Sequence, residues 1–210
     1  MIIKLVVIAL AGYLLGNIQT GVLVSKSIGN FDIRHKGSKS AGTTNVLRTM
    51  GWVPSVITLL GDVLKGALGS LIGLWLMGEW GARLGGLMAV IGHNWPVLFG
   101  FKGGKGIATS LGLILVTDPI IGVMLPVCQA IVVKLTHTMS IASIVSATFY
   151  LIASVIAHFG AWNYIAFAVI IWVLAVYTHR ENLVRIRDKK EHKLDFEEIN
   201  EISKKKNQGG

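Results

Sequence analysis

The stretch Ile107–Val133, IATSLGLILVTDPIIGVMLPVCQAIVV, decides the fold of this chain. Both halves of the stretch are apolar, and Asp118-Pro119 interrupts them near the middle. Aspartate is favoured at the residue that caps a helix N-terminus, and proline is favoured at the first helical position. The stretch therefore predicts either one long helix or two short helices that meet at Asp118.

The composition of the chain is that of a membrane protein. Its 210 residues are 52% hydrophobic and 15% charged, with a mean hydropathy of +0.63, whereas soluble domains average about 25% charged residues. The net charge of +9 lies between apolar runs, so an anionic membrane face or phosphorylated substrates explain it better than nucleic acid does. We expect membrane lipid as a partner and no nucleic acid. A single cysteine, Cys128, excludes an intrachain disulfide.

Apolar runs elsewhere in the chain approach the roughly 20 residues that a membrane span requires. They are Ile2–Val24, Val53–Leu76, Leu84–Phe99, Met139–Ala157 and Trp162–Tyr177. Glycine pairs four residues apart, such as Gly12/Gly16, Gly69/Gly73 and Gly81/Gly85, either allow close helix packing or reflect chance in a glycine-rich chain.

The distribution of lysine and arginine decides how often the stretch at 107–133 crosses the membrane. If it crosses twice and the N-terminus is outside, 17 of the 20 Lys and Arg residues lie on the cytoplasmic side, as the positive-inside rule requires. Lys4 and Arg83 then lie outside, and Lys65 lies within a span. A single crossing would place the basic tail opposite the first two basic loops. A re-entrant pair of helices satisfies the same parity.

The sequence therefore predicts an all-α integral membrane protein with seven transmembrane helices, an external N-terminus and a cytoplasmic C-terminus. We expect one polytopic domain over residues 1–193, followed by a polar cytoplasmic tail over residues 194–210 that is either solvated or faces the lipid headgroups.

The loop Phe99-Gly-Phe-Lys-Gly-Gly-Lys-Gly-Ile-Ala-Thr109 carries two lysines and four glycines between apolar segments. Glycine lets backbone N–H groups approach a ligand, lysine adds positive charge, and a helix beginning near Gly106 would add its N-terminal dipole. The loop does not fit the Walker A pattern. It suits either a phosphate or contact with lipid headgroups.

Four polar clusters fall on the same predicted face of the membrane: Gly37–Arg48, Gly92–Thr109, His137–Ser143 and His179–Arg185. Together they offer the hydroxyl, amide, glycine N–H, lysine and arginine donors that a phosphate or an oxyanion needs. Taken singly, each has a structural alternative. The segment Ser38–Asn45 could cap a helix, Ser140 and Ser143 could bond backbone carbonyls, and Arg180 and Arg185 could anchor the chain at the interface.

Asp62 and Lys65 lie within an apolar span, three residues apart on one helical face. Charges at that depth cost about 2.5–3.5 kcal/mol each on insertion scales, so they are usually paired or functional. We expect a structural ion pair near the site in preference to a proton relay.

These motifs resemble the bacterial membrane glycerol-3-phosphate acyltransferases that use acyl-phosphate as donor. The resemblance reaches from the start of the chain to about Lys193. Its most specific part is Gly92-His93-x-x-Pro96 followed by Phe101-Lys-Gly-Gly-Lys-Gly-x-Ala-Thr109. Other matching segments are Gly37-Ser38, Gly42-x-Thr44-Asn45-x-x-Arg48, Asp62-x-x-Lys65-Gly66, Ser140-x-x-Ser143 and His179-Arg180-x-Asn182-x-x-Arg185.

The chain departs from the family pattern at several positions near these motifs. Lys39 and Ser40 stand where the family usually has Gly-Asn, and His137 stands where it often has arginine. Asn17 and Gln19 occupy the place of a Ser-x-Pro segment.

The resemblance implies transfer of an acyl group from a fatty acyl-phosphate to glycerol 3-phosphate, the first acylation in phospholipid synthesis, at the bacterial cytoplasmic membrane. We expect no cofactor, and no metal because the histidines are scattered and lack carboxylate partners at ligand spacing. The resemblance adds as a partner the soluble enzyme that supplies acyl-phosphate. The expected catalytic residues are Ser38, Arg48, Lys105, Ser143, His179 and Asn182. The expected substrate-binding residues are Thr44, Asn45, His93, Lys102, Gly103, Gly104, Ser140, Arg180 and Arg185.

Two further function classes fit parts of the pattern. A transporter or channel for phosphorylated anions would also have many spans, charges within spans and interrupted helices, although no inverted repeat is evident. A lipid-binding structural protein would not require so many phosphate donors. The absence of any His-x-x-x-x-Asp segment, which the acyl-CoA-dependent class uses, favours the acyl-phosphate class.

Overall fold

The structure is a computed structural model that describes residues 1–208, with side chains described through Lys204. Within that range every regular element is a helix. The chain divides into two compact units, one formed by residues 1–113 with 195–210 and the other by residues 114–194. The second unit consists of helices that follow one another in the chain, whereas the first combines the N-terminal helices with the C-terminal helix α10, which contacts α3 and α4.

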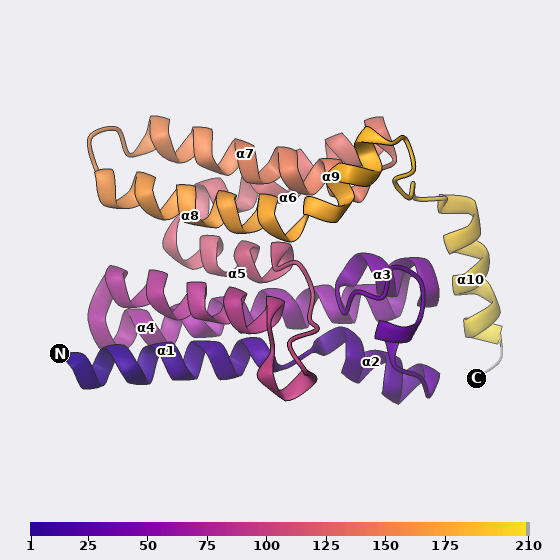
Figure 1. The fold of residues 1–210 in the computed structure, drawn as a ribbon, viewed down its shortest axis with the longest axis horizontal. Coiled ribbons are helices and arrows are strands. Elements are labelled where there is room, and N and C mark those ends of the chain that lie inside the picture. The colour runs from indigo at the N-terminus through magenta and orange to yellow at the C-terminus, as the bar shows by residue number, and fades with distance from the viewer. Residues whose placement is uncertain (209–210) are drawn as a thin grey trace. The chain divides into compact units, whose positions relative to one another are not determined.

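The first unit is built on α1 (Ile2–Asn17), α2 (Thr20–Gly29) and α4 (Trp52–Asn94). α4 consists of two helical legs, because Met77 (φ −146°) and Gly78 (φ 65°) leave the helical conformation between them. α1 packs along α4 (Figure 1). The apolar stretches predicted at Val53–Leu76 and Leu84–Phe99 thus belong to legs joined by a tight turn.

The second leg of α4 begins earlier and ends earlier than the predicted stretch at Leu84–Phe99. Arg83 bonds Glu79 one turn before it, at 3.2 Å between Nη2 and Oε2, so polar residues continue the helix instead of interrupting it. The leg ends at Asn94, two residues before Pro96, which disfavours helical geometry in the residue that precedes it. A short 3₁₀ helix, η2 (Val97–Phe99), follows.

Glycines bring the helices of the first unit into direct backbone contact. A Cβ atom on Gly12 would collide with the carbonyl of Gly85, and one on Gly73 would collide with the carbonyl of Gly81. The glycine spacing of the sequence therefore serves close helix packing and is not a product of chance.

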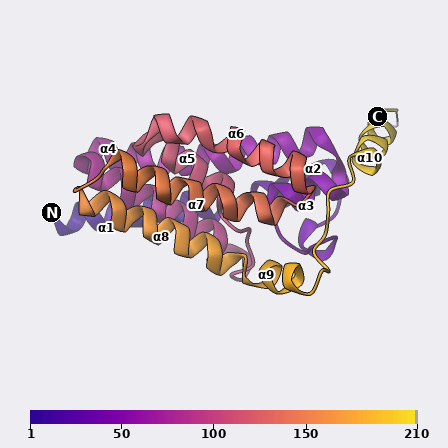
Figure 2. The ribbon, with the colours of Figure 1, turned by 90° about the horizontal axis from the view of Figure 1, so that it is seen from above.

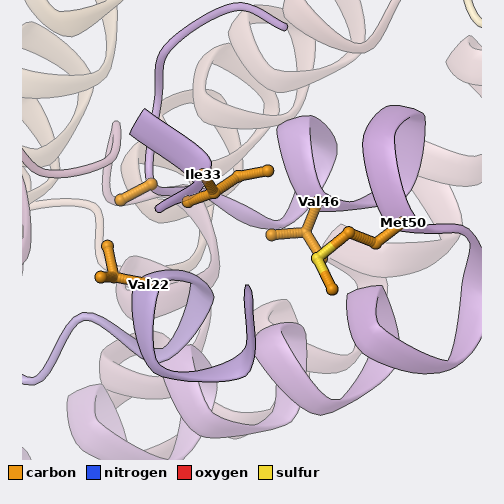
Figure 3. Packing of buried hydrophobic residues seen from close by; sticks show 5 residues of the cluster. Val22, Ile33, Val46 and Met50 are labelled. Atoms are coloured by element: carbon orange, nitrogen blue, oxygen red, sulfur yellow. The ribbon is translucent and has the colours of Figure 1, made fainter. Parts of the chain in front are cut away.

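A small hydrophobic core holds the segment between α2 and α4. Val22 from α2, Ile33 from η1 (Ile33–His35), and Val46 and Met50 from α3 (Thr43–Met50) are fully buried together with Ala41 (Figure 3). Full burial of one such large side chain stabilises a fold by about 1.5–3 kcal/mol. The core thereby fixes the segment that carries the first predicted polar cluster.

Most of the segment expected to be a polar tail is helical in the structure. Residues Phe196–Gln208 form α10, and this helix packs against the start of α4 in the first unit. The Trp52 and Phe196 rings stack with their centroids 6.3 Å apart, and the Trp52 indole N–H donates to the Asn200 side-chain oxygen at 2.8 Å. Ile199 is buried, and Ser203 Oγ accepts the Trp52 backbone N–H. Apolar residues at helical spacing give this polar segment an apolar face, and the amphipathic helix packs through that face.

The second unit contains α6 (Pro119–Thr136), α7 (Met139–Ala157), α8 (Trp162–Thr178) and α9 (Arg180–Arg187). α7 packs against α6 and α8, and the three run side by side in Figure 2. α5 (Ile107–Thr117) precedes α6 and ends immediately before Asp118. The stretch at 107–133 is therefore two helices, as one of the two sequence alternatives predicts.

Asp118 stands at the N-cap position of α6, as predicted, although its side chain does not cap the helix. Its Oδ2 atom instead lies 2.8 Å from Nε2 of His158, and the His158 ring stacks on Tyr164 with centroids 4.2 Å apart. The carboxylate thus ties the turn before α6 to the turn between α7 and α8.

Several helices are long and apolar enough to cross a membrane. Within the described residues, four pass this test: Ile2–Gly29, Trp52–Phe99, Pro119–Thr136 and Met139–Ala157. A fifth is obtained if α8 and α9, which are bent by 58°, count as one span, and α5 is a shorter apolar helix. The chain is therefore an all-α protein of the multi-pass membrane type.

Candidate active site

The glycine loop, defined here as residues 100–106, connects η2 to α5 in the first unit. Gly100 (φ 65°) and Gly106 (φ 79°) have left-handed backbone conformations that favour glycine. α5 begins at Ile107, directly after the loop. The loop therefore precedes a helix N-terminus, the position at which unpaired N–H groups attract an anion.

His93 packs against the glycine loop and leaves no room for a side chain at two of its glycines. A Cβ atom on Gly103 would collide with the carbonyl oxygen of His93, and one on Gly104 would collide with its imidazole. The Gly104 N–H donates to the His93 carbonyl at 3.1 Å. This amide is thus engaged within the protein, so Gly104 serves the loop through its missing side chain.

We expect Gly104→Ala to reduce kcat/KM at least about tenfold, because the new methyl group must displace either the His93 ring or the loop. Steady-state kinetics with both substrates measures the effect. Gly100→Ala is the matched control, since a Cβ there meets no atom within 4 Å although the positive φ angle adds some strain. Equal activity of the two variants would contradict the packing argument.

Asn45 organises the loop that contains Ser38, in the predicted polar cluster Gly37–Arg48. Its buried Nδ2 group donates to the carbonyls of Ile33, Lys36 and Ser40 at 3.2, 3.0 and 2.8 Å, and its Oδ1 accepts the Ser38 N–H at 2.9 Å. Asn45 is therefore engaged in holding this loop together.

The side chain of Ser38 lies on the surface, between Gly37 (φ 57°) and Lys39 (φ 59°). Thr44 lies in the first turn of α3 and Arg48 lies one turn further, and both are half-buried. The helix α3 has Gly42 at its N-cap without a side-chain cap. The cluster thus presents Ser38 on a loop and Arg48 on a helix.

The two loops lie side by side within the first unit. The Ala41 N–H donates to the Gly103 carbonyl at 3.4 Å, and Arg34 Nη1 donates to the Phe99 carbonyl at 2.9 Å. Arg34 is itself held by Asp32, with Nη2 and Oδ2 2.7 Å apart. Hydrogen bonds from Arg34 lower the pKa of the Asp32 carboxyl to about 2. The expected proximity of the two segments is confirmed.

The two lysines of the glycine loop differ in exposure. Lys102 is exposed, and Lys105 is half-buried. A half-buried ammonium group is screened less by salt than an exposed one, so it attracts a bound phosphate more strongly.

Asp62 and Lys65 form the ion pair that the sequence predicts. Lys65 Nζ lies 2.9 Å from Asp62 Oδ1, and both side chains are almost completely buried. The same lysine also lies 2.6 Å from His93 Nδ1. The pair therefore reaches the base of the glycine loop through His93.

Glu191 gathers three of the predicted residues in the second unit. Its Oε1 accepts from Ser140 Oγ at 2.9 Å and from Asn182 Nδ2 at 2.6 Å, and its Oε2 accepts from Arg185 Nε at 2.7 Å. Burial by itself raises the pKa of the Glu191 carboxyl, but the hydrogen bonds from Asn182, Arg185 and Ser140 outweigh it, so the pKa lies below its usual value. Nothing in the sequence distinguishes this residue, because it is one of seven acidic residues among nine basic residues between Arg180 and Lys206.

Ser143 and His179 form hydrogen bonds within their own helices. Ser143 Oγ donates to the Met139 carbonyl at 2.9 Å, which agrees with the structural alternative for this serine. His179 Nδ1 lies 2.8 Å from the Ala175 carbonyl, and because a carbonyl only accepts, Nδ1 carries the proton. In neutral His179, Nε2 is then the ring nitrogen that carries no proton.

Arg180 lies at the surface, where its guanidinium stacks on the Tyr177 ring at 4.5 Å and donates to the Tyr177 carbonyl at 3.1 Å. These contacts suit an interfacial anchor.

Comparison with known proteins identifies the family. Residues 6–189 match the model of the family described as glycerol-3-phosphate acyltransferase. This chain belongs to the glycerol-3-phosphate acyltransferase family. Its curated relatives include the glycerol-3-phosphate acyltransferase of Alkaliphilus metalliredigens, which is 40% identical over 91% of this chain and 96% of its own length. The enzyme of Clostridioides difficile is also 40% identical, over 92% of this chain and 97% of its own length.

The fold is also that of a glycerol-3-phosphate acyltransferase of known structure. PlsY, an integral membrane glycerol 3-phosphate acyltransferase crystallised in its glycerol 3-phosphate form, is 33% identical, with a TM-score of 0.86 over 93% of this chain and 98% of its own. Its lysophosphatidic acid form gives a TM-score of 0.84 at 31% identity. The chain is thus a PlsY-type acyltransferase of phospholipid synthesis, and the transporter alternative receives no support.

Proposed function

We propose that this acyltransferase transfers the acyl group of a fatty acyl-phosphate to the C1 hydroxyl of sn-glycerol 3-phosphate, forming lysophosphatidic acid and inorganic phosphate. The observation that carries the proposal is the likeness to PlsY in its glycerol 3-phosphate and lysophosphatidic acid forms. The absence of a His-x-x-x-x-Asp segment from the sequence further favours acyl-phosphate over acyl-CoA as the donor.

The chemistry needs positioning and charge stabilisation more than a covalent intermediate. The C1 oxygen attacks the acyl carbon, the bond from that carbon to the phosphate oxygen breaks, and the phosphate departs as an anion. The hydroxyl proton passes to a base, for which the candidates are His179 Nε2 and a phosphate of the substrates. An acyl-phosphate is already activated, so Ser38 and Ser143 serve as hydrogen-bond donors and not as nucleophiles in this scheme.

We assign the predicted residues to two substrate phosphates and to orientation of the reactants. Lys105, with Lys102 and Gly103, binds one phosphate at the glycine loop, which the contact between Gly104 and His93 supports. Ser38, Thr44 and Arg48 bind the other, on the loop that Asn45 holds. Ser143 and Asn182 orient the substrates, and Ser140, Arg180 and Arg185 complete the polar face of the second unit. The contact between the two loops of the first unit supports this assignment.

The activity is tested by supplying the purified protein with palmitoyl phosphate and glycerol 3-phosphate. Mass spectrometry should detect lysophosphatidic acid, and palmitoyl-CoA in place of palmitoyl phosphate should yield none. Product formed only from palmitoyl-CoA would overturn the donor assignment. Flux of glycerol 3-phosphate into sealed liposomes without acylation would overturn the proposal as a whole.

We further propose seven membrane crossings, with the N-terminus outside and the active site and C-terminus in the cytoplasm of a bacterium. The turn at Met77–Gly78, which divides α4, and the break at Asp118 support this number. In this arrangement residues 1–193 act as one domain of the cytoplasmic membrane, and residues 194–210 are cytoplasmic. A soluble enzyme then delivers acyl-phosphate from the cytoplasmic side.

The orientation is tested with cysteines placed at two exposed positions, Lys39 and Glu79, in a Cys128→Ala background. A membrane-impermeant maleimide applied to intact cells should label the cysteine at 79 and leave the one at 39 unlabelled until the cells are opened. Labelling at position 39 from outside would refute the orientation.

A further inference from the structure

Three ionisable side chains are buried together in the first unit. Two of them, Asp62 and Lys65, have no role in the acyl-transfer scheme above. Asp62 and Lys65 lie on the first leg of α4, and His93 lies at the end of its second leg. They are 1%, 3% and 3% exposed. At membrane depth, an ionised side chain costs about 2.5–3.5 kcal/mol on insertion scales, which makes a retained cluster a candidate for a functional role.

Lys65 fixes the protonation state of His93. Its Nζ atom lies 2.9 Å from Asp62 Oδ1, 2.7 Å from the Ile18 carbonyl and 2.6 Å from His93 Nδ1. An ammonium group has donors and no acceptor, so with Lys65 protonated as the ion-pair partner of Asp62, His93 Nδ1 is the acceptor of the 2.6 Å contact. The imidazole is then neutral, with its proton on Nε2.

Asp62 completes this arrangement by holding Lys65 and not by holding the histidine directly. Its Oδ1 atom lies 3.6 Å from His93 Nδ1, which is beyond hydrogen-bond distance, but 2.9 Å from Lys65 Nζ. The order of contacts is therefore Asp62 to Lys65 to His93.

The other side of His93 faces the glycine loop. Its Nε2 atom is the atom that a Cβ on Gly104 would meet first, and its carbonyl accepts the Gly104 N–H at 3.1 Å. The same carbonyl accepts from the buried side chain of Gln19 at 3.2 Å. Ring and carbonyl of His93 thus both contact the loop one residue before Lys105, so a rotation of the ring would displace the loop.

We infer that Asp62 and Lys65 are positioning residues for acyl transfer: they hold His93 as a neutral Nε2–H imidazole, and His93 in turn sets the position of the glycine loop at Gly104 and Lys105. This inference rests on the proposed function, in which the glycine loop binds a substrate phosphate. It gives the ion pair a role in substrate binding beyond mutual neutralisation, and it places that role on residues that touch neither substrate.

The test uses the double variant Asp62→Leu/Lys65→Met. Removing one partner alone would leave an unpaired buried charge, at a cost of about 3–5 kcal/mol, whereas replacing both with apolar residues is often neutral. The matched control is Arg83→Met, which removes a buried charge from the same helix, one that pairs with Glu79 and stacks on Trp80.

Two readouts do not depend on catalysis. Nitrogen-15 spectra of the histidine side chains in detergent should show the proton of His93 on Nε2 in the wild type and in Arg83→Met, and a changed pattern in the double variant. Titration with inorganic phosphate should shift the Gly103 and Gly104 amide signals in the wild type, and the double variant should need at least about tenfold more phosphate. A wild-type His93 with its proton on Nδ1, or an unaltered phosphate titration in the double variant, would overturn the inference.

Kinetics then tests whether the pair acts through His93. The double variant should raise KM for one phosphate-bearing substrate at least about tenfold, while Arg83→Met leaves KM unchanged. Added to His93→Ala, the double substitution should cause no further loss, because residues that act through one another are not additive. Additive losses would overturn the inference. A wild type without acyltransferase activity would instead refute the proposed function, and the spectra would still decide the role of the pair.

Discussion

Lys105→Ala is expected to lower kcat/KM by at least about tenfold, which corresponds to roughly 1.4 kcal/mol of transition-state stabilisation. The reason is the position of Lys105 in the glycine loop, half-buried and two residues before α5 begins. Negative charge moves onto the departing phosphate as the acyl bond breaks, and a fixed ammonium group stabilises it more in the transition state than in the ground state. Arg48→Ala on α3 should have an effect of at least the same size.

Initial rates over a range of both substrate concentrations measure the effect of each variant. Lys26→Ala is the matched control, because this lysine belongs to the same unit but is exposed, with only a 4.0 Å ion pair to Asp32. Exposed ion pairs contribute about 0–1 kcal/mol, so the control should retain wild-type kinetics. Wild-type turnover in both Lys105→Ala and Arg48→Ala would remove these residues from the site.

Glu191→Ala is expected to destabilise the second unit by about 3–5 kcal/mol, as breaking a buried ionic network generally does. The carboxylate is the common acceptor for Ser140, Asn182 and Arg185, and its side chain is only 8% exposed. Without it, three donors lose their partner and α9 loses its connection to the start of α7. The melting temperature in detergent and the acyltransferase activity should fall together.

The conservative variant Glu191→Gln should lie between the wild type and Glu191→Ala. A glutamine oxygen can still accept from Ser140 and Asn182, but its amide group would then face the Arg185 donor. Glu181→Ala is the control, since this glutamate is an exposed residue of α9. Equal melting temperatures of Glu191→Ala and Glu181→Ala would contradict the prediction.

The same network predicts how stability depends on pH. The Glu191 carboxyl has a pKa below its usual 4.5 in the folded protein, so the unfolded state binds more protons in that range. Its contribution is complete above about pH 4.5 and is lost as the pH falls through the lowered pKa. The stability difference between the wild type and Glu191→Gln should therefore be constant from pH 7 to about pH 5 and shrink at lower pH.

The sequence predicted the helices and the proximity of the two loops because the signals are local. Apolar runs mark the segments that can lie in the hydrocarbon core of a bilayer, and basic loops mark the cytoplasmic side. Asp118-Pro119 divided two helices, with Pro119 at the first position of α6, where proline is favoured. The pairing of Asp62 with Lys65 followed from helical spacing alone.

The tertiary structure decided the role of polar residues whose side chains suit both the fold and a ligand. Asn45 has the side chain of a binding residue, yet its amide holds the backbone of residues 33–40. Glu191 gives no local signal, because its partners come from α7 and α9. The few apolar residues of the tail gave no sign of packing in the sequence, because their partner Trp52 is distant in the chain and contacts Phe196 only in the folded protein.

By itself, the sequence determined the all-α membrane class, the breaks between helices and the motifs of the family, since each depends on residues close together in the chain. Only the tertiary structure decided what supports the glycine loop that precedes the stretch at 107–133: His93 contacts the loop, and the pair of Asp62 and Lys65 lies behind His93. The physical reason is that a hydrogen bond or an ion pair over a distance of about 3 Å needs both partners in place, and these partners are brought together by the folding of α4.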